Sequence, residues 1–509
     1  MAITRNSAWN NGGTFKNADL LWYAKGVGVM QTRALNDTKS WWFFAAIHGQ
    51  EISLPQFPGW GHLPAPPAVP TTPLPTVAVR NLYWDQCQHQ SWYFPPWHRG
   101  YLYALEAHVR AAVVGLGGPK TWALPYWNYF GPKNQYEIPP AFTTAKLPDG
   151  SPNPLLVKAR YGPLGTGKVY VEIPPASEKC QNNTIYTGSN PATPFPGYGG
   201  PQTGFSHFGQ TNGNLESNPH NLVHVDVGGN GPNNTYGLMS DPGLAALDPI
   251  FYLHHCNIDR MWAAWNAKGN ANPTAQNWLK GPPAVGGRKF AMPMPNGTSW
   301  VYTPADVNSI TQLKYTYESL STAIVLVHPT QLIAQRLTKL GASPAAEIKA
   351  PEASMDMGDK SELVGANQGP VQLKTSGARA TVKLDSKAQK KVSSSLAKAS
   401  AEALPDRAYL QLENVRGNFD ANKLDVSVNQ QHVGTVALFG LRRASLKDSG
   451  HGGEGLTFVI DITDVIDSLF LNGALDANSL DVRIVPSSPV PDSADITIGR
   501  VSVYRQAQQ

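Results

Sequence analysis

The chain is organised around two short stretches, His220-Asn221-Leu222-Val223-His224 and Asp248-Pro249-Ile250-Phe251-Tyr252-Leu253-His254-His255-Cys256-Asn257-Ile258-Asp259-Arg260-Met261-Trp262. Two histidines four residues apart on a helix point from the same face, as two ligands of one metal ion do. The second stretch starts like a helix, because aspartate caps a helix and proline suits its first position. His255 follows on that helix. Together the stretches predict two helices that hold one metal ion with three imidazoles and leave one position open.

The second helix also places side chains above and below His255. At helical spacing Phe251 lies one turn before it and Asp259 one turn after it. We expect Phe251 to wall the site and Asp259 to orient the ring of His255 without binding the metal. An isolated His-x-x-x-His pair is usually an ordinary core or surface pair, but here a second set of histidines accompanies it.

That second set lies upstream, in two aromatic-rich segments. His48 ends an apolar segment, 41–48, that is typical of a buried helix closed by a glycine. His89 follows Cys87 by two residues, and His98 stands in the first turn of a helix that two prolines can start. The prediction is two triads of ligands: His48, His89 and His98, then His220, His224 and His255.

All six predicted ligands are imidazoles. The carboxylate-rich di-iron arrangement would need Glu-x-x-His pairs, and magnesium or manganese prefer oxygen ligands. Imidazole ligation suits zinc or copper. Two facing three-coordinate sites favour copper, because Cu(I) tolerates low coordination and two ions can bind O₂ between them.

Composition limits the class of protein. A chain of 509 residues suffices for two or three domains. Only 15% of the residues are charged, while 47 glycines, 43 prolines and 14 tryptophans indicate long ordered loops lined with rings. The net charge is +5 and no basic stripe is present, so a nucleic-acid partner is not expected. No pattern indicates an oligomeric state.

The sequence also bears on location. It contains no run of 18 apolar residues and no apolar signal region near its start, so we expect neither a membrane partner nor a signal peptide. Three cysteines do not make a disulfide framework, which agrees with a reducing compartment. The expected location is cytoplasmic, and a carrier-assisted export route stays open.

The patterning predicts two domains and a linker. Residues 1–340 are expected to form a mainly α catalytic domain, an antiparallel helix bundle with long loops at 52–80, 120–219 and 263–325 and a first helix at 18–35. Residues 341–368 hold few large apolar side chains and suit an exposed linker. From 369 to 509 the period becomes two, which predicts a small all-β sandwich interrupted by a solvated excursion at 387–404. Its candidate strands are 371–373, 380–384, 409–412, 424–428, 458–460, 482–485 and 496–504.

The histidine segments resemble the copper motifs of type-3 copper proteins, in particular the tyrosinase and polyphenol oxidase family. The first motif matches at 46–49, 87–89 and 97–99, and the second at 220–224 and 248–260. The resemblance is close over about 40–325. Residues 423–429 and 496–499 resemble, more loosely, the β-domain of plant polyphenol oxidases. The chain lacks the plant transit peptide and paired N-terminal cysteines, which indicates a bacterial member.

The resemblance implies two copper ions, O₂ as co-substrate and small phenols as substrates. It implies His255 as the third ligand of the second copper and leaves His254 outside the ligand set. It also implies a thioether bond between Cys87 and the ring of His89. Val225 is expected to face the entrance and to admit rings without selecting a charge.

The resemblance further implies oxidation of o-diphenols to o-quinones. Hydroxylation of a monophenol first needs its proton removed, and a phenol pKa of about 10 disfavours this at neutral pH. In family members that hydroxylate, a glutamate and an asparagine hold a basic water, and Glu216 and Asn221 occupy those positions. Three alternatives stay open: an o-diphenol or o-aminophenol oxidase without hydroxylation, an O₂ carrier, and a zinc-binding structural protein.

The C-terminal domain contains no histidine cluster and no nucleophile with a base. We predict that it covers the copper entrance and restrains activity; the alternative is that it only adds stability or solubility. The candidate plug is Ala437-Leu438-Phe439-Gly440-Leu441, because three large apolar side chains beside a glycine are unusual at an exposed bend. Phe439 is the expected blocking residue.

Overall fold

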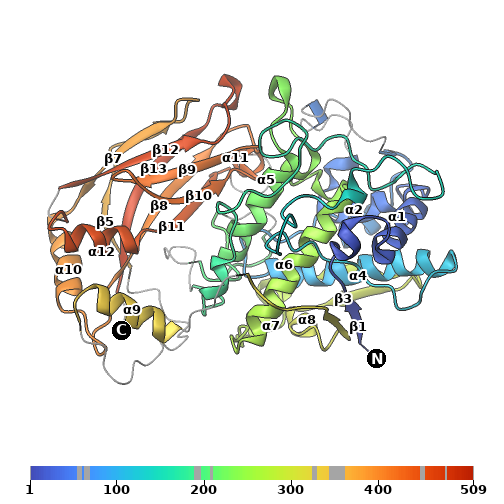
Figure 1. The fold of residues 1–509 in the computed structure, drawn as a ribbon, viewed down its shortest axis with the longest axis horizontal. Coiled ribbons are helices and arrows are strands. Elements are labelled where there is room, and N and C mark those ends of the chain that lie inside the picture. Colours follow the sequence, from blue (N-terminus) through green and yellow to red (C-terminus); the bar gives the residue numbers. More distant parts are fainter. Residues whose placement is uncertain are drawn as a thin grey trace.

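The computed structural model describes residues 2–53, 60–61, 69–188, 196–206, 210–323, 329–342, 361–447, 453–475 and 478–507. Figure 1 shows the helix-rich first part of the chain beside a sheet-rich C-terminal part. The prediction of a mainly helical domain followed by a small β-rich domain is confirmed. Within the described ranges no helix has the length and apolarity needed to cross a membrane.

Two of the helices that carry histidines begin at side chains that cap their first turn. The Ser40 hydroxyl accepts the Phe43 amide N–H at 3.0 Å and caps α2. The Asp248 carboxylate accepts the Ile250 amide N–H at 3.0 Å and caps α6, whose first residue is Pro249, as predicted. Every residue of α6 from Pro249 to Trp265 is buried, so this helix lies in the centre of its domain. The bounds of these helices are α2 Trp41–His48, α4 Phe94–Gly115, α5 Leu222–Gly228 and α6 Pro249–Ala267.

Around this centre α1 (Ala18–Gln31) packs on α4, and α4 packs on α6. The helix expected over 18–35 ends earlier, at Gln31, and Leu35 is buried although it lies beyond the helix. In their described parts, the stretches predicted as loops, 52–80, 120–219 and 263–325, hold mostly short elements. The longest element that lies wholly within one of them is α3, in 52–80. The remaining elements of this domain are η1 Asn10–Gly13, η2 Gln50–Ser53, α3 Val77–Tyr83, η4 Pro140–Phe142, η5 Lys179–Asn182, η6 Glu216–Asn221, η7 Pro232–Asn234, η8 Leu238–Ser240, η9 Ala245–Leu247, α7 Gln276–Leu279, η10 Pro282–Val285, α8 Pro304–Val307, and the strand pairs β1 Ile3–Arg5 with β4 Tyr315–Tyr317 and β2 Phe290–Pro293 with β3 Ser299–Tyr302. The next helix, α9 Pro329–Lys339, packs with the C-terminal domain, where its Arg336 pairs with Asp467 at 2.8 Å.

The C-terminal domain is built on one nine-stranded sheet with the order β10-β9-β12-β7-β5-β13-β8-β11, and β6 pairs with β13. The two end strands, β10 and β11, also approach each other. The strands therefore close round as one barrel-like sheet rather than stacking as two sheets. The strand bounds are β5 Ser361–Ala366, β6 Val371–Gln372, β7 Ala378–Leu384, β8 Arg407–Arg416, β9 Lys423–Val428, β10 Gln431–Ala437, β11 Leu456–Asp461, β12 Ser479–Pro486 and β13 Thr497–Gln506.

Two expectations for this part of the chain are wrong. The segment 387–404 is not a solvated excursion, because 386–397 form α10, which buries Ala388, Val392 and Leu396 at helical spacing. The predicted linker, 341–368, also ends too late, since β5 pairs with β13 and β7 from Ser361 onward. Residues 343–360 of that linker lie outside the described part. The domain also contains two helices that the alternating pattern did not predict, α11 Leu441–Ser445 and α12 Thr463–Leu471.

The two domains meet through a buried apolar contact and through ion pairs. Phe439 and Ala437 belong to the buried apolar cluster of the helical domain, although their chain segment comes from the C-terminal domain. Nearby, Arg443 pairs with Glu51 at 2.5 Å and with Asp85 at 3.1 Å. The C-terminal domain is thus docked on the face of the helical domain that holds the histidines.

Candidate metal centre

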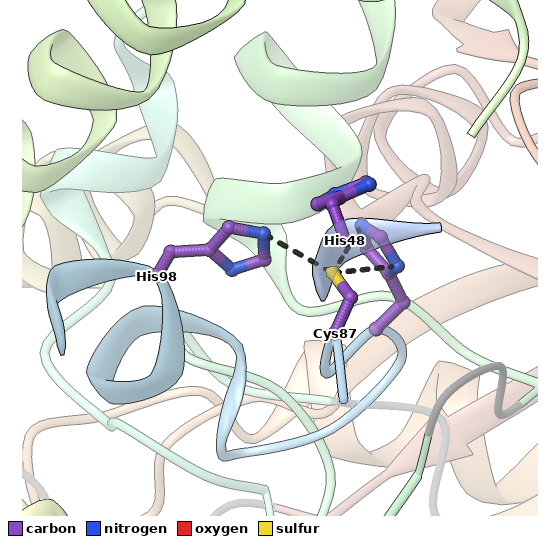
Figure 2. A group of neighbouring side chains, drawn as sticks. His48, Cys87 and His98 are labelled. Atoms are coloured by element: carbon purple, nitrogen blue, oxygen red, sulfur yellow. Dashed lines mark hydrogen bonds between the residues drawn. The ribbon is translucent and has the colours of Figure 1, made fainter. Parts of the chain in front are cut away.

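The first group of possible ligands contains Cys87 and the predicted triad His48, His89 and His98. One ligand atom from each lies within 4.8 Å of the others, and all four residues are buried. His48 ends α2 and His98 stands in the first turn of α4, while the other two lie in the loop before α4. Figure 2 shows the Cys87 sulfur directed at the His98 ring with His48 beside them.

The second group contains His220, His224, His254 and His255, again buried and with ligand atoms within 4.8 Å of one another. It is assembled from η6, α5 and α6. The structure therefore brings the six predicted histidines into two groups and adds a fourth histidine to the second. His254, which the sequence left outside the ligand set, stacks on His220 with ring centroids 5.2 Å apart.

Hydrogen bonds orient four of these rings in the same sense. In each, Nδ1 donates to a nearby oxygen, so the lone pair on Nε2 is directed to the centre of its group. Nε2 of His224 has no hydrogen-bond partner among the described residues. The accepting oxygens are Pro242 O for His48 at 3.0 Å, Phe94 O for His98 at 2.8 Å, Asn221 Oδ1 for His220 at 2.7 Å and Met239 O for His224 at 2.8 Å.

Burial keeps four of the predicted ligand imidazoles neutral. Burial lowers the pKa of His220 to about 3. Burial, followed by the neighbouring histidines, lowers the pKa of His98, His224 and His255 well below the usual value. Neutral imidazole is the form that binds a metal, so the site needs no deprotonation before it takes up an ion.

The two groups face each other. The rings of His98 and His255, one from each group, stack with centroids 4.5 Å apart and an interplanar angle of 17°. Phe251 packs against both groups, at 4.8 Å from His48 and 4.1 Å from His255, and so forms the aromatic wall that its spacing predicted. The arrangement is that of a single binuclear site.

The spacing of nitrogen atoms suits a metal ion. Nε2 of His220 lies 3.2 Å from Nε2 of His255. Two nitrogen ligands of a tetrahedral ion, each bound at about 2.0–2.1 Å, lie about 3.3 Å apart. Within the described residues neither group includes a carboxylate. The donor set therefore fits copper or zinc and does not fit a metal that prefers oxygen.

Glu216 starts the π-helix η6, which also contains Pro219 and ends at Asn221. Both oxygens of its carboxylate accept the amide N–H of Gln90, at 3.0 Å each, and Gln90 directly follows His89. Burial raises the pKa of Glu216 to about 8, although the Gln90 amide lowers it. In the absence of metal ions this carboxyl group is therefore mostly protonated at neutral pH. Nearby cations would lower its pKa and favour the ionised form.

The expected role of Asp259 is wrong. Its carboxylate does not reach His255, whose Nδ1 has no hydrogen-bond partner among the described residues. It accepts instead from Arg99 Nε at 2.5 Å and from Arg5 Nη1 at 3.1 Å. Burial alone would raise the pKa of Asp259, but these two cations hold it below its usual value. The carboxylate belongs to a buried ionic network that joins β1, α4 and α6.

Phe439 reaches the histidines from the other domain. Its ring stacks on that of His224 with centroids 4.1 Å apart and an angle of 21°, and its centroid lies 6.3 Å from that of His89 in the first group. Only 3% of its surface is exposed. Val225 is buried in the same apolar cluster. An aromatic ring of the C-terminal domain therefore occupies a position against ligands of both groups.

Several groups at the site carried no signal in the sequence. Met239 and Pro242 orient histidines through their backbone carbonyls, and Gln90 holds Glu216 through its backbone amide. Backbone groups are the same in every residue, so no side-chain pattern marks them.

Two buried, facing groups of neutral histidines on a helical core define the class of protein, a binuclear metalloprotein of the type-3 copper kind. Comparisons with known proteins agree. Residues 38–268 match the common central domain of tyrosinase, and residues 360–506 match a family described only as a domain of unknown function. The chain is 31% identical over 512 residues to tyrosinase HcTyr1 of Hahella sp. (strain CCB-MM4), covering 96% of this chain and 97% of that one. The chain belongs to the tyrosinase family and is an enzyme of that family.

More distant relatives show how widely the arrangement extends. Polyphenol oxidase E, chloroplastic, of Solanum lycopersicum is 32% identical over 198 residues, which is 38% of this chain and 33% of the plant protein. The fold is similar to that of latent apple tyrosinase, with a TM-score of 0.56 at 20% identity over 100% of this chain and 98% of that one. It is also similar to the fold of latent aurone synthase, with a TM-score of 0.56 at 18% identity over 100% and 90% of the two chains.

Proposed function

We propose that the enzyme holds two copper ions and uses O₂ to hydroxylate monophenols to o-diphenols and to oxidise o-diphenols to o-quinones, and that its C-terminal domain restrains this activity. The observation that carries the proposal is the pair of facing, buried groups of neutral imidazoles without a carboxylate ligand. Small phenols are the proposed substrates, and neither a nucleic acid nor a membrane is a proposed partner. His48, His89 and His98 would hold one ion, and His220, His224 and His255 the other.

Bound copper would supply O₂ binding and accept electrons from the phenol. The chain supplies the surroundings for that chemistry. Burial removes water from the site, which strengthens electrostatic interactions within it. Phe251 and Phe439 place aromatic faces beside the ligands, at 4.1 Å from His255 and 4.1 Å from His224. A phenol ring in the position of Phe439 would stack on His224 in the same way.

Hydroxylation would also need a base for the phenol proton. Glu216 is the candidate, because it is buried, carries no cationic side-chain partner in the described part of the chain, and has a pKa of about 8 that burial raises. Asn221 Oδ1 accepts from His220, which leaves its amide N–H groups to hold a water molecule beside the ligand. The proposed route takes the proton from the phenol through this water to Glu216.

A specific observation favours the alternative, an o-diphenol oxidase that lacks hydroxylation. Both oxygens of Glu216 already accept from Gln90, and Asn221 already accepts from His220. If the bonds to Gln90 keep the Glu216 carboxylate away from the phenol, Glu216 cannot take the phenol proton, and the amide of Asn221 cannot act as a base in its place. The relatives are named for both kinds of chemistry, one as a catechol oxidase of Solanum tuberosum and one as a hydroxylase of Larrea tridentata.

Copper content tests the core of the proposal. The wild-type chain should bind two copper ions and oxidise catechol with consumption of O₂. His224→Ala removes a buried imidazole of the second group and should leave at most one ion and no catechol oxidation. Elemental analysis and oxygen uptake measure both. The control is His432→Ala, which removes an exposed histidine of β10 and should change neither. Two ions and wild-type oxidation in His224→Ala would contradict the assignment.

Glu216→Gln tests the proton route. Glutamine keeps an oxygen that can accept from Gln90 but cannot take the phenol proton. Monophenol turnover should fall by about 10²–10⁴-fold, the usual contribution of a general base. Turnover of the matching o-diphenol serves as the internal control and should change far less. Equal losses on the two substrates would remove Glu216 from the proton route and support the diphenol-oxidase alternative.

We also propose the thioether between Cys87 and His89. The Cys87 sulfur lies 3.5 Å from Nδ1 and 3.8 Å from Nε2 of His89. The ring carbon bonded to both nitrogens is Cε1, and it is the carbon to which we propose that the sulfur bonds. Bond formation would remove the hydrogen of the thiol and the hydrogen of Cε1, and O₂ would be the oxidant that takes up the two electrons and two protons.

Mass spectrometry tests the bond. After copper loading in air, the peptide containing residues 87–89 should lose the mass of two hydrogens, and Cys87 should resist alkylation in the unfolded chain. Cys180 is the control, because it is also buried but lies outside both histidine groups, and it should alkylate fully. An alkylated Cys87 in copper-loaded, active enzyme would rule the bond out.

The proposed restraint is competition between Phe439 and substrate. Phe439 stacks on a ligand ring and is almost fully buried, so a phenol can take its place only when the segment moves away. The apparent affinity for substrate is then reduced by the fraction of time that the site is open. Arg443 strengthens the closed state through ion pairs with Glu51 and Asp85.

Phe439→Ala should therefore activate the full-length enzyme. If the site is open about a tenth of the time, removing the ring should raise kcat/KM for a small phenol by about tenfold, mainly through KM. Cleavage within residues 341–368 should raise it further for bulky phenols. Phe470→Ala, which removes a ring from α12 of the same domain, is the matched control and should not activate. Unchanged kinetics in Phe439→Ala would mean that the domain only stabilises the enzyme.

A further inference from the structure

One short segment of the helical domain, 238–243, contacts both histidine groups. The Met239 carbonyl accepts from Nδ1 of His224 at 2.8 Å, and the Pro242 carbonyl accepts from Nδ1 of His48 at 3.0 Å. The segment thus sets the direction of one ring in each group. Any shift of this segment would turn a ligand of both groups at once.

The other oriented rings do not depend on a distant segment. His98 donates to Phe94 one turn earlier in its own helix, and His220 donates to the side chain of the next residue, Asn221. Their orientation follows from the helices that carry them. For His48 and His224, it depends on how firmly segment 238–243 is held in place.

Asp241 stands in the middle of this segment and is fully buried. Its Oδ1 accepts the Gly243 amide N–H at 2.8 Å, which closes the turn that presents the Pro242 carbonyl to His48. Its Oδ2 accepts from Arg442 Nη2 at 2.7 Å. The carboxylate therefore connects the turn directly to a cation of the C-terminal domain.

Arg442 belongs to α11, three residues after Phe439, and is itself held firmly. Its backbone amide donates to Asp420 Oδ1 at 2.8 Å, and its Nε lies 3.5 Å from Asp420 Oδ2. Burial, opposed by Arg442 and assisted by the nearby Asp241, raises the pKa of Asp420 to about 7. One guanidinium thus serves two buried carboxylates, one from each domain. Without it, the charge of Asp241 would be buried unpaired, which is strongly unfavourable.

The turn has little room to absorb a displacement. A Cβ placed on Gly49, the residue after His48, would lie 2.6 Å from the carbonyl oxygen of Gly243. The end of α2 and the turn are therefore in direct backbone contact. Movement of the turn must move the end of α2, and with it the ring of His48.

We propose that Asp241 and Arg442 are positioning residues of the metal centre, so that the C-terminal domain holds metal in both groups as well as covering them. The inference rests on the proposed function, in which the two groups hold copper. Loss of the ion pair frees the turn, both rings lose their fixed direction, and copper leaves both groups faster. Removing a partner that orients a ligand usually weakens metal binding by about 10–100-fold.

The experiment uses copper-loaded, full-length enzyme challenged with excess bicinchoninate under reducing conditions, and follows the rate of copper transfer to the chelator. Arg442→Met should release both ions at least about tenfold faster than wild type, in line with the usual effect of losing an orienting partner. Arg442→Lys, which keeps the charge, should recover part of the retention. The thermal unfolding midpoint of each metal-free variant is measured alongside.

The matched control is Arg443→Met. Arg443 neighbours Arg442 on α11 and makes ion pairs across the same interface, but its partners Glu51 and Asp85 lie outside segment 238–243. It should lower the metal-free midpoint to a similar extent without accelerating release.

The outcomes separate the inference from the function on which it rests. If the wild-type chain takes up no copper, the proposed function fails. If it binds two ions and Arg442→Met releases them at the wild-type rate, or if Arg443→Met releases them equally fast, the positioning role is wrong. Should Arg442→Met fail to fold, Asp241→Asn gives the same test, because asparagine keeps the bond to Gly243 but not the charge pair.

Discussion

The structure depends on keeping imidazoles buried, neutral and aimed at one another. Histidine in water is hydrated at both nitrogens, and burial gives up that hydration. Here each oriented ring regains one hydrogen bond at Nδ1, to an oxygen fixed by the fold, while Nε2 faces the centre. Such a site is costly for the folded protein without an ion and favourable with one. The buried stretch 249–265 of α6 and the tryptophan-rich core around it supply the rigid surroundings that hold these rings in place.

The sequence predicted those parts of the site that are encoded by side-chain type and helical spacing. The pair His220 and His224, the cap at Asp248 and the triad before α4 all follow from such local rules. Asp259 shows where local rules fail. Its spacing from His255 was read correctly, but two arginines from distant segments bind it more strongly than an imidazole can. Long-range competition of this kind has no local signature.

The β-rich domain was predicted less completely. Its strands alternate, so most were found, but β5 and β10 were missed, and closure of the sheet depends on contacts between strands far apart in sequence. The helix α10 was hidden by its lysines and serines, although Ala388, Val392 and Leu396 repeat at helical spacing. Phe439 was found because apolar residues at a bend need a partner, and the structure provides that partner in the other domain.

The short distance in sequence between Phe439 and Arg442 has a consequence for the lifetime of the enzyme. Arg442 follows Phe439 by three positions in the chain. One movement of this segment therefore withdraws both the ring that stacks on His224 and the guanidinium that holds the turn at Asp241. An event that opens the site would then also start the loss of its metal ions. Each activated molecule would catalyse for a limited time before those ions dissociate. The stored form would be durable and the working form transient. Such a pairing would confine the quinone product of the proposed reaction to a brief interval after the site opens.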